Sequence, residues 1–257
     1  MTQPDATAEH PATPAPPSGR IDCHSHLLPG IDDGCADLHE SVASIQSLRR
    51  HGYTATICTP HHWVGKYPYI APDHVRVWVQ QLRDELRDLC EDYTLYAGGE
   101  LRIDTHTADW MKDHAPPTLA DSKLVLCDFW QDKWRPFIDQ AFGRLLDQGY
   151  TPVLAHPERS YGPRDYEDHL KRLQSEGVLL QGNLSSFTGV NGPEAERLAR
   201  MLLTEGRYAF LALDMHRPDS LDDRLDGIGL AENLIGAEAV NDLLDAIPKR
   251  LIFGEPD

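Results

Sequence analysis

Cysteine is scarce in this sequence, and the arrangement of the few cysteines excludes one kind of chemistry. The 257 residues contain five, Cys23, Cys35, Cys58, Cys90 and Cys127, with no Cys-x-x-Cys pair. An odd number of unpaired cysteines is typical of a reducing compartment, so we expect a cytoplasmic protein. No cysteine is followed six positions later by arginine, so the Cys-x5-Arg loop of thiol-based phosphatases is absent.

Long apolar runs and a surplus of positive charge are also missing. No apolar run approaches the roughly 18–20 residues that span a bilayer, so we expect no membrane insertion. Asp and Glu number 41 against 24 Lys and Arg, which gives a formal net charge of −17. This charge argues against nucleic acid as a partner. It would also repel a phosphorylated substrate, unless cations at the site reverse the local field.

The start of the chain differs in composition from the rest. Residues 1–19 are rich in proline, alanine and threonine, and they have neither the basic start nor the apolar stretch of a secretory signal. We expect them to form a disordered leader. Residues 20–257 contain no evident repeat or linker, and their length suits a single α/β barrel domain.

From residue 20 onward, short strand-like runs alternate with amphipathic helical patterns. We expect strands at residues 20–26, 53–58, 94–97, 124–127, 151–154, 178–181 and 208–213. We expect helices at residues 38–51, 73–91, 135–148, 165–176 and 193–205 and a helical tail at 225–245, with Asp73 as the N-cap of the second helix. Alternating strands and helices predict a parallel sheet. Closure into a barrel is favoured over an open dinucleotide-binding sheet, because no glycine-rich phosphate turn follows the first strand.

Five stretches that carry histidine or carboxylate lie at or just beyond the C-terminal ends of predicted strands. They are Asp22-Cys23-His24-Ser25-His26, Thr59-Pro60-His61-His62, Gly98-Gly99-Glu100, Ala155-His156-Pro157-Glu158-Arg159 and Asp214-Met215-His216. Active sites of α/β barrels form on this face. Imidazole and carboxylate groups bind divalent metals through nitrogen and oxygen. The sequence therefore predicts a hydrolytic site with several metal ions.

Strand alternation indicates which side chains face the site. His24 and His26 should share one face of the first strand, with Cys23 and Ser25 on the other. Asp214 and His216 repeat this pattern after the last predicted strand.

Regular spacing links three further candidates. Glu100, Asp128 and His156 each end a predicted strand at equal intervals, since 128 − 100 = 28 and 156 − 128 = 28. Such intervals are close to one or two strand–helix units and would place neighbouring ligands side by side. Glu100 follows two glycines and is a candidate to bridge two ions. Asp128 has an alternative role, because it could pair with a nearby arginine.

Two pairs of neighbouring residues leave the choice open. Asp32 and Asp33 follow the first strand closely and could be metal ligands or ordinary turn residues. His61 and His62 follow a strand and a proline, and one of the two should face the centre.

A resemblance to a known family rests on these motifs together. Residues 21–34, Ile-Asp-Cys-His-Ser-His-Leu-Leu-Pro-Gly-Ile-Asp-Asp-Gly, resemble the opening of the polymerase and histidinol phosphatase (PHP) superfamily. More narrowly, they are similar to the bacterial metal-dependent protein-tyrosine phosphatases of capsule and exopolysaccharide gene clusters, the CpsB/CapC type. The later motifs, including Gln181-Gly182-Asn183-Leu184-Ser185-Ser186, match in the same order. The resemblance covers about residues 20–253.

The resemblance implies a distorted (β/α)7 TIM-like barrel with three divalent metal ions. Manganese is the usual metal of the family, with iron or zinc as alternatives. The implied ligands are His24, His26, Glu100 and Asp214 for one ion; Glu100, Asp128 and His156 for a second; and Asp33, His61 and His216 for the third. Family members usually carry glutamate where Asp128 stands.

The resemblance also implies catalytic groups beyond the metal ligands. Arg159 matches a phosphate-contacting arginine, and Arg224, or alternatively Arg217, corresponds to a second one. Asp214 or His216 could protonate the leaving oxygen.

The function that these expectations favour is hydrolysis of phosphotyrosine on a protein, with the tail of a bacterial tyrosine kinase that governs polysaccharide export as the implied substrate. A small-molecule phosphatase such as histidinol-phosphatase is an alternative with the same fold and centre. An amidohydrolase-type barrel would need a lysine or another carboxylate as its metal bridge, and no lysine ends a predicted strand. A metal-binding regulator without turnover is a further alternative. The oligomeric state stays open; the helix at residues 38–51 could serve assembly, although packing on the barrel is favoured.

Overall fold

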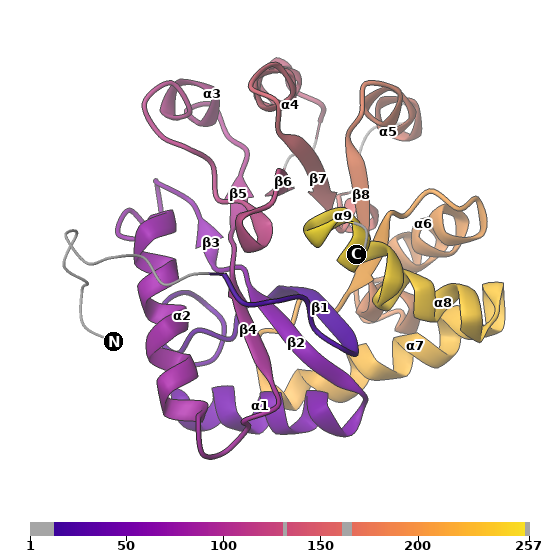
Figure 1. The fold of residues 1–257 in the computed structure, drawn as a ribbon. Helices are drawn as coiled ribbons and strands as arrows, with labels where there is room; N and C mark the ends of the chain where they lie inside the picture. Colours follow the sequence, from indigo (N-terminus) through magenta and orange to yellow (C-terminus); the bar gives the residue numbers. More distant parts are fainter. Residues whose placement is uncertain (1–12, 131–132, 161–165, 255–257) are drawn as a thin grey trace.

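Parallel strands surrounded by helices form the computed structural model, which describes residues 13–130, 133–160 and 166–254 (Figure 1). One sheet contains β1 (Arg20–Ser25), β2 (Tyr53–Cys58) and β4 (Thr94–Ala97) in that spatial order. The other contains β3 (His61–His62), β5 (Glu100–Arg102), β6 (Leu124–Asp128), β7 (Thr151–Ala155), β8 (Leu179–Asn183) and β9 (Phe210–Ala212). Every paired strand runs parallel to its neighbour.

The chain itself connects the two sheets. β2 leads into β3 across Thr59 and Pro60, and β4 leads into β5 across Gly98 and Gly99. On the other side, Ser25 of β1 bridges in parallel to Met215, just beyond β9. If β2 with β3 and β4 with β5 are each counted as one interrupted strand, the nine strands of the described residues become seven (9 − 2 = 7). Seven is the number that the sequence predicted. The fold class is therefore the predicted α/β arrangement of parallel strands and helices.

Helices cover the outside of the strands, except for the last one, which packs on the inner part of the core (Figure 1). They are α1 (Leu38–Arg50), α2 (Pro72–Leu86), α3 (Thr107–Trp110), α4 (Pro136–Asp147), α5 (Tyr166–Ser175), α6 (Pro193–Thr204), α7 (Leu221–Ile235), α8 (Ala237–Leu244) and α9 (Ala246–Phe253). Within the described residues, none of these helices combines the length and the apolar character needed to cross a bilayer.

Two helical predictions differ from the structure. The second helix begins at Pro72 rather than Asp73, with Ala71 at the N-cap position, and it ends at Leu86. Proline suits the first helical position, because the N–H that it lacks would have no partner there. The predicted tail at residues 225–245 is instead divided into α7 and α8, and a further helix, α9, follows it. Gly236, with φ of 90°, separates the first two helices.

The hydrophobic core has two parts, separated by the strands. Alternate strand residues, among them Ile21, Ala55, Leu126 and Val153, pack together with Ile252 of α9 in an inner cluster. Strand residues of the opposite parity form an outer cluster with the surrounding helices. This alternation is what buries both faces of a parallel sheet. In Figure 1, α9 lies in the middle of the view, between the strands of the two sheets.

The segment before β1 is held to the rest of the molecule where the structure describes it. Residues 1–12 of the predicted leader lie outside the described residues. Within residues 13–19, the Tyr96 hydroxyl donates to the carbonyl of Ala15, and the Gly19 amide donates to Thr54 Oγ1 at 2.9 Å.

Helix α7 approaches the short η3 turn (Leu184–Thr188), which follows β8, unusually closely. A Cβ atom at Gly227 would lie 2.1 Å from the carbonyl oxygen of Leu184, whereas a Cβ atom at Gly229 would meet nothing within 4 Å. Gly227 is buried and Gly229 is exposed. The packing of α7 therefore needs glycine at one of these two positions only.

We expect Gly227→Ala to lower the free energy of unfolding by about 1–3 kcal/mol, the usual cost of overpacking. Gly229→Ala should raise it by about 0.5–1 kcal/mol, because alanine has the higher helix propensity. Chemical denaturation of both variants measures the two changes. Equal effects of the two substitutions would contradict the close approach of α7 to η3.

Candidate metal centre

An irregularity in β1 directs two histidines into one site. Between Asp22 and Ser25 the chain advances three residues, while the paired segment of β2, Thr56 to Cys58, advances two. The extra residue breaks the simple alternation, as at a β-bulge. Cys23 packs in the inner cluster with Ile21, two residues before it, and so does not face away from His24 and His26 as had been expected. Both histidines nevertheless face the centre.

The first group of candidate ligands surrounds the Nε2 atoms of these two histidines. Asp214 Oδ1 lies 3.3 Å from His24 Nε2 and 3.5 Å from His26 Nε2. The Glu100 carboxylate lies 3.5 Å from the first Nε2 and 3.6 Å from the second. Both Nε2 atoms are buried and have no hydrogen-bond partner among the described residues. Buried unpaired donors and acceptors are costly, so this site fits a cation that these nitrogens would coordinate.

The opposite ring nitrogens of the same histidines are fixed by hydrogen bonds. His24 Nδ1 lies 3.0 Å from Gln181 Oε1, and His26 Nδ1 lies 2.7 Å from Asp32 Oδ2. Such contacts orient an imidazole and leave Nε2 for a metal. Asn183 Nδ2 similarly donates to Asp214 Oδ2 at 3.0 Å. The three supporting residues were not assigned this role from the sequence, although Gln181 and Asn183 lie in a motif noted there.

His156 belongs to a second group, together with His24 and Glu100. Its Nε2 lies 3.1 Å from Glu100 Oε1. His156 and Asp214 both have left-handed backbone conformations, with φ of 33° and 51°. Residues other than glycine seldom adopt such φ values, and those that do cluster at functional sites. The turns after β7 and β9 therefore carry strain at the two residues that face the centre.

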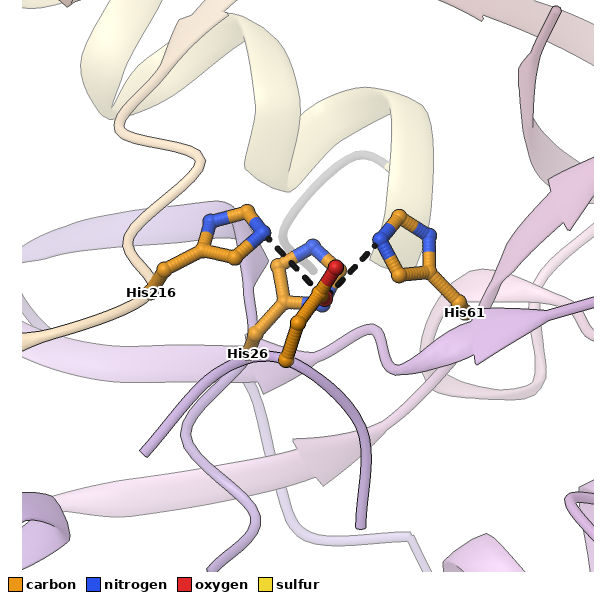
Figure 2. A group of neighbouring side chains, drawn as sticks. His26, His61 and His216 are labelled. Carbon is orange, nitrogen blue, oxygen red and sulfur yellow. Dashed lines mark ion pairs between the residues drawn. The ribbon is translucent and has the colours of Figure 1, made fainter. Parts of the chain in front are cut away.

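A third group lies nearer the surface, where the imidazoles of His26, His61 and His216 converge (Figure 2). Asp33 Oδ1 lies 3.2 Å from His61 Nε2 and 3.6 Å from His216 Nε2. Both residues of the Asp32-Asp33 pair thus contact histidines of the site. Asp32 contacts Nδ1 of His26, the ring nitrogen opposite the centre, whereas Asp33 lies on the solvent-exposed side of the group.

His62, the neighbour of His61, points away from this centre. Its ring packs so closely on Gly99 that a Cβ atom there would lie 2.3 Å from His62 Nδ1. It lines a cavity of about 500 Å³ on the other side of β3, together with Trp63, Leu101 and Trp110. Of the two histidines left open by the sequence, the structure therefore brings only His61 to the cluster.

Asp128 lies beside the centre but is paired with an arginine. Its Oδ2 accepts a hydrogen bond of 2.6 Å from Arg102 Nη1, while its buried Oδ1 has no partner among the described residues. Burial and the nearby Glu100 carboxylate raise the pKa of Asp128. Asp128 is not part of the three groups of converging ligand atoms found in the described residues. The arginine pair is the alternative that the sequence had left open.

The carboxylates of the centre are held in the charged form. Burial alone would raise the pKa values of Glu100 and Asp214, but the surrounding imidazoles, His24 first, lower both well below the usual range. A carboxylate that stays ionised in a buried site is suited to hold a cation.

The imidazoles respond in different ways to the same surroundings. Burial lowers the pKa of His26, but Asp32 and Asp214 together raise it to about 9. The pKa of His61 rises to about 11 against its burial, chiefly because of Glu100 and Asp33. Burial and the charge of His26 lower the pKa of His216 to about 4. Without cations, protons on His26 and His61 balance the acidic groups.

The predicted arginines differ in where their guanidinium groups lie. Arg159 Nη1 donates to Asp214 Oδ2 at the edge of the centre, and its side chain is 30% exposed. Arg224 instead donates to the backbone carbonyls of Leu213, Asp214 and Ser220. Arg217, the alternative to Arg224, is exposed.

Glu158 has a structural role that the sequence did not reveal. Its buried carboxylate accepts hydrogen bonds from the Asn183 amide at 2.8 Å, Ser186 Oγ at 2.9 Å and the Tyr208 hydroxyl at 2.9 Å. Through the backbone N–H of Asn183, it connects the turn that carries His156 to the end of β8. The only sequence signal is its place in the Ala-His-Pro-Glu-Arg motif.

Comparisons with known proteins place the chain in a family. Residues 20–252 match the family model described as capsular polysaccharide synthesis, CpsB/CapC. The chain is 32% identical over 198 residues to the tyrosine-protein phosphatase YwqE of Bacillus subtilis, with 76% of this chain and 77% of that protein covered.

Solved structures show the same fold. A structure from work on YwqE of B. subtilis and CpsB of Streptococcus pneumoniae, described as unique metal-dependent tyrosine phosphatases, superposes with a TM-score of 0.79. It is 28% identical in sequence and covers 92% of this chain and 95% of its own. A histidinol phosphate phosphatase of Lactococcus lactis, 17% identical, covers 84% of this chain and 94% of its own with a TM-score of 0.51. This last likeness shows a shared fold alone.

We expect Tyr208→Phe to lower the free energy of unfolding by about 1–3 kcal/mol, because it leaves one oxygen of the buried Glu158 carboxylate without a donor. Tyr53→Phe is the matched control, since the buried Tyr53 hydroxyl has no hydrogen-bond partner among the described residues. Its removal should leave stability unchanged or raise it. Urea denaturation of both variants measures the difference, and equal losses would contradict an anchoring role of Glu158.

Proposed function

The chain belongs to the CpsB/CapC family of capsular polysaccharide synthesis proteins, and from this membership we propose that it is a metal-dependent protein-tyrosine phosphatase. The observation that carries the proposal is the buried cluster of imidazoles and carboxylates at the strand ends, with its unpartnered Nε2 atoms. The cysteines offer no competing nucleophile. All five are buried, and burial raises the pKa of each thiol above its usual value.

Three divalent cations would be held by the residues that the sequence indicated. His24, His26, Glu100 and Asp214 would hold one, and Asp33, His61 and His216 another, in accord with two of the converging groups. Glu100 and His156 would hold the third, with Asp128 as its further ligand. Nitrogen and carboxylate ligands without thiolate suit manganese, iron or zinc, and we propose manganese.

The ions would supply charge neutralisation at the phosphoryl oxygens and would lower the pKa of water. Arg159 adds a positive charge at the rim beside Asp214, where phosphoryl oxygens would lie. His216, with its pKa lowered to about 4, is neutral near pH 7 and therefore suits a ligand better than an acid. A phenolate leaving group needs little protonation, so Asp214 as a proton donor would be of minor importance.

Arg224 would act through the backbone. Its hydrogen bonds to the Leu213 and Asp214 carbonyls hold the left-handed turn that presents the Asp214 carboxylate. We therefore propose Arg224 as a positioning residue, and Arg159 as the arginine that contacts phosphate.

The substrate that we propose is a phosphotyrosine protein, in particular the tail of a bacterial tyrosine kinase of polysaccharide export. The family description and the tyrosine phosphatase relatives support this choice. The five free cysteines support a cytoplasmic location. Residues 20–257 would act as one catalytic domain, preceded by a leader.

We expect chelation to abolish hydrolysis of phosphotyrosine peptides and re-addition of manganese to restore it. Glu100→Gln and His156→Asn should each lose more than about 100-fold in turnover, because even residues behind the ligands of metal sites are worth about 10–100-fold. Asparagine tolerates the left-handed backbone of position 156. Metal analysis should show reduced metal content in both variants.

His51→Ala is the matched control, since His51 is exposed and, among the described residues, its side chain bonds only to the Ser47 carbonyl. Circular dichroism verifies that every variant is folded. Wild-type rates in folded Glu100 and His156 variants would remove these residues from the centre. Efficient turnover of histidinol phosphate with no action on phosphotyrosine would favour a small-molecule phosphatase.

Cation binding should release protons. A histidine whose pKa is raised to about 9, as for His26, keeps its proton below that pH, and a cation requires the neutral ring. Apparent affinity for manganese should therefore increase as the pH rises toward about 9. Titration calorimetry near neutral pH, in two buffers with different heats of ionisation, measures the protons released. Identical heats in both buffers would contradict a protonated cluster.

A further inference from the structure

Arg102 lies at the entrance of the centre. It follows Glu100 by two residues in β5, and it pairs in register with Asp128 of β6. Residues two apart in a strand share a face, so Arg102 lies on the side of Glu100 and closer to the C-terminal end of the strand. Barrel substrates enter from that end. The guanidinium is therefore on the path between solvent and the metal centre.

Two tryptophans pack against this guanidinium. Its central carbon lies 4.9 Å from the ring centroid of Trp63 and 4.7 Å from that of Trp130. Asp128 fixes its orientation through Nη1, and the Arg102 side chain is 10% exposed. A guanidinium has five N–H donors, and only the bond to Asp128 is formed within the described residues. The guanidinium is thus held by Asp128 and two indole rings and keeps N–H donors for a further ligand.

Trp130 adds an aromatic surface at the same entrance. Its side chain is 62% exposed, although a tryptophan that served only to shield the Arg102–Asp128 pair would bury more of its own surface. Aromatic rings prefer offset stacking or edge contacts with other rings. The guanidinium and the indole together complement the two parts of an aryl phosphate, its anionic phosphoryl group and its flat ring.

We propose that the Trp63–Arg102–Trp130 stack is the element that binds aryl phosphate esters in preference to alkyl phosphate esters. Arg102 contacts phosphoryl oxygens opposite Arg159, and the exposed face of Trp130 contacts the aromatic ring of the leaving group. Trp63 packs against the guanidinium and helps to hold it in place. The assignment rests on the proposed function and specifies how that site recognises its substrate. It also identifies a second phosphate-binding arginine, because the guanidinium of Arg224 faces backbone carbonyls.

The test compares the full chain, loaded with manganese, on a phosphotyrosine peptide and on the same peptide with phosphoserine. Trp130→Leu keeps an apolar side chain and removes the aromatic face. We expect it to lower the ratio of kcat/KM for the two peptides about 3- to 10-fold, mainly through KM for phosphotyrosine, as expected for one lost aromatic contact. Leu89→Ala, an exposed apolar residue remote from the site, is the control and should keep the wild-type ratio.

Arg102→Lys keeps the charge but loses the planar stack and the paired donors. It should weaken binding of a phosphotyrosine peptide in which a non-hydrolysable phosphonate replaces the phosphate, measured by calorimetry. Unchanged phosphonate affinity in Arg102→Lys and in Trp130→Leu would overturn the proposal. So would a fall in both peptide rates by the same factor, which indicates a structural role only. A wild-type chain that binds the phosphonate but hydrolyses no phosphoester would refute the proposed function and leave this recognition standing.

Discussion

The Glu100 carboxylate is the contact on which the candidate site depends. It is buried, and it touches four imidazoles from segments far apart in the chain. The distances are 3.5 Å to His24, 3.6 Å to His26, 2.7 Å to His61 and 3.1 Å to His156. A buried charge with so many partners fixes the relative position of three strand ends, because any displacement would leave it uncompensated. The other acidic groups are arranged around this point.

The local charge of the site contrasts with that of the whole molecule. The chain carries a formal net charge of −17, which would repel a phosphate ester in solution. At the centre, however, imidazoles with raised pKa values and the guanidiniums of Arg159 and Arg102 counter the carboxylates. Bound cations would reverse the field further. An anionic substrate would therefore be attracted by the charges at the entrance rather than by the net charge of the molecule.

The sequence predicted where the strands lie along the chain and which motifs follow them, because periodicity and strand ends are local properties. What it missed depends on contacts between distant segments. The irregularity at Cys23 appears only when β1 is paired with β2. The sequence left an arginine pair open for Asp128 but could not name the arginine, because its pairing with Arg102 depends on the register of β5 and β6. The anchoring by Glu158 needs three partners that the chain brings together only when folded.

The interruptions at Pro60 and at Gly98-Gly99 have a mechanical consequence. They divide the strands into two sheets, and the candidate ligands lie on both sides of the seam. His24 and His26 belong to the three-stranded side, whereas His61, Glu100 and His156 belong to the six-stranded side. A cation shared between these residues would link the two sheets. Metal binding would then also limit the movement of one sheet relative to the other.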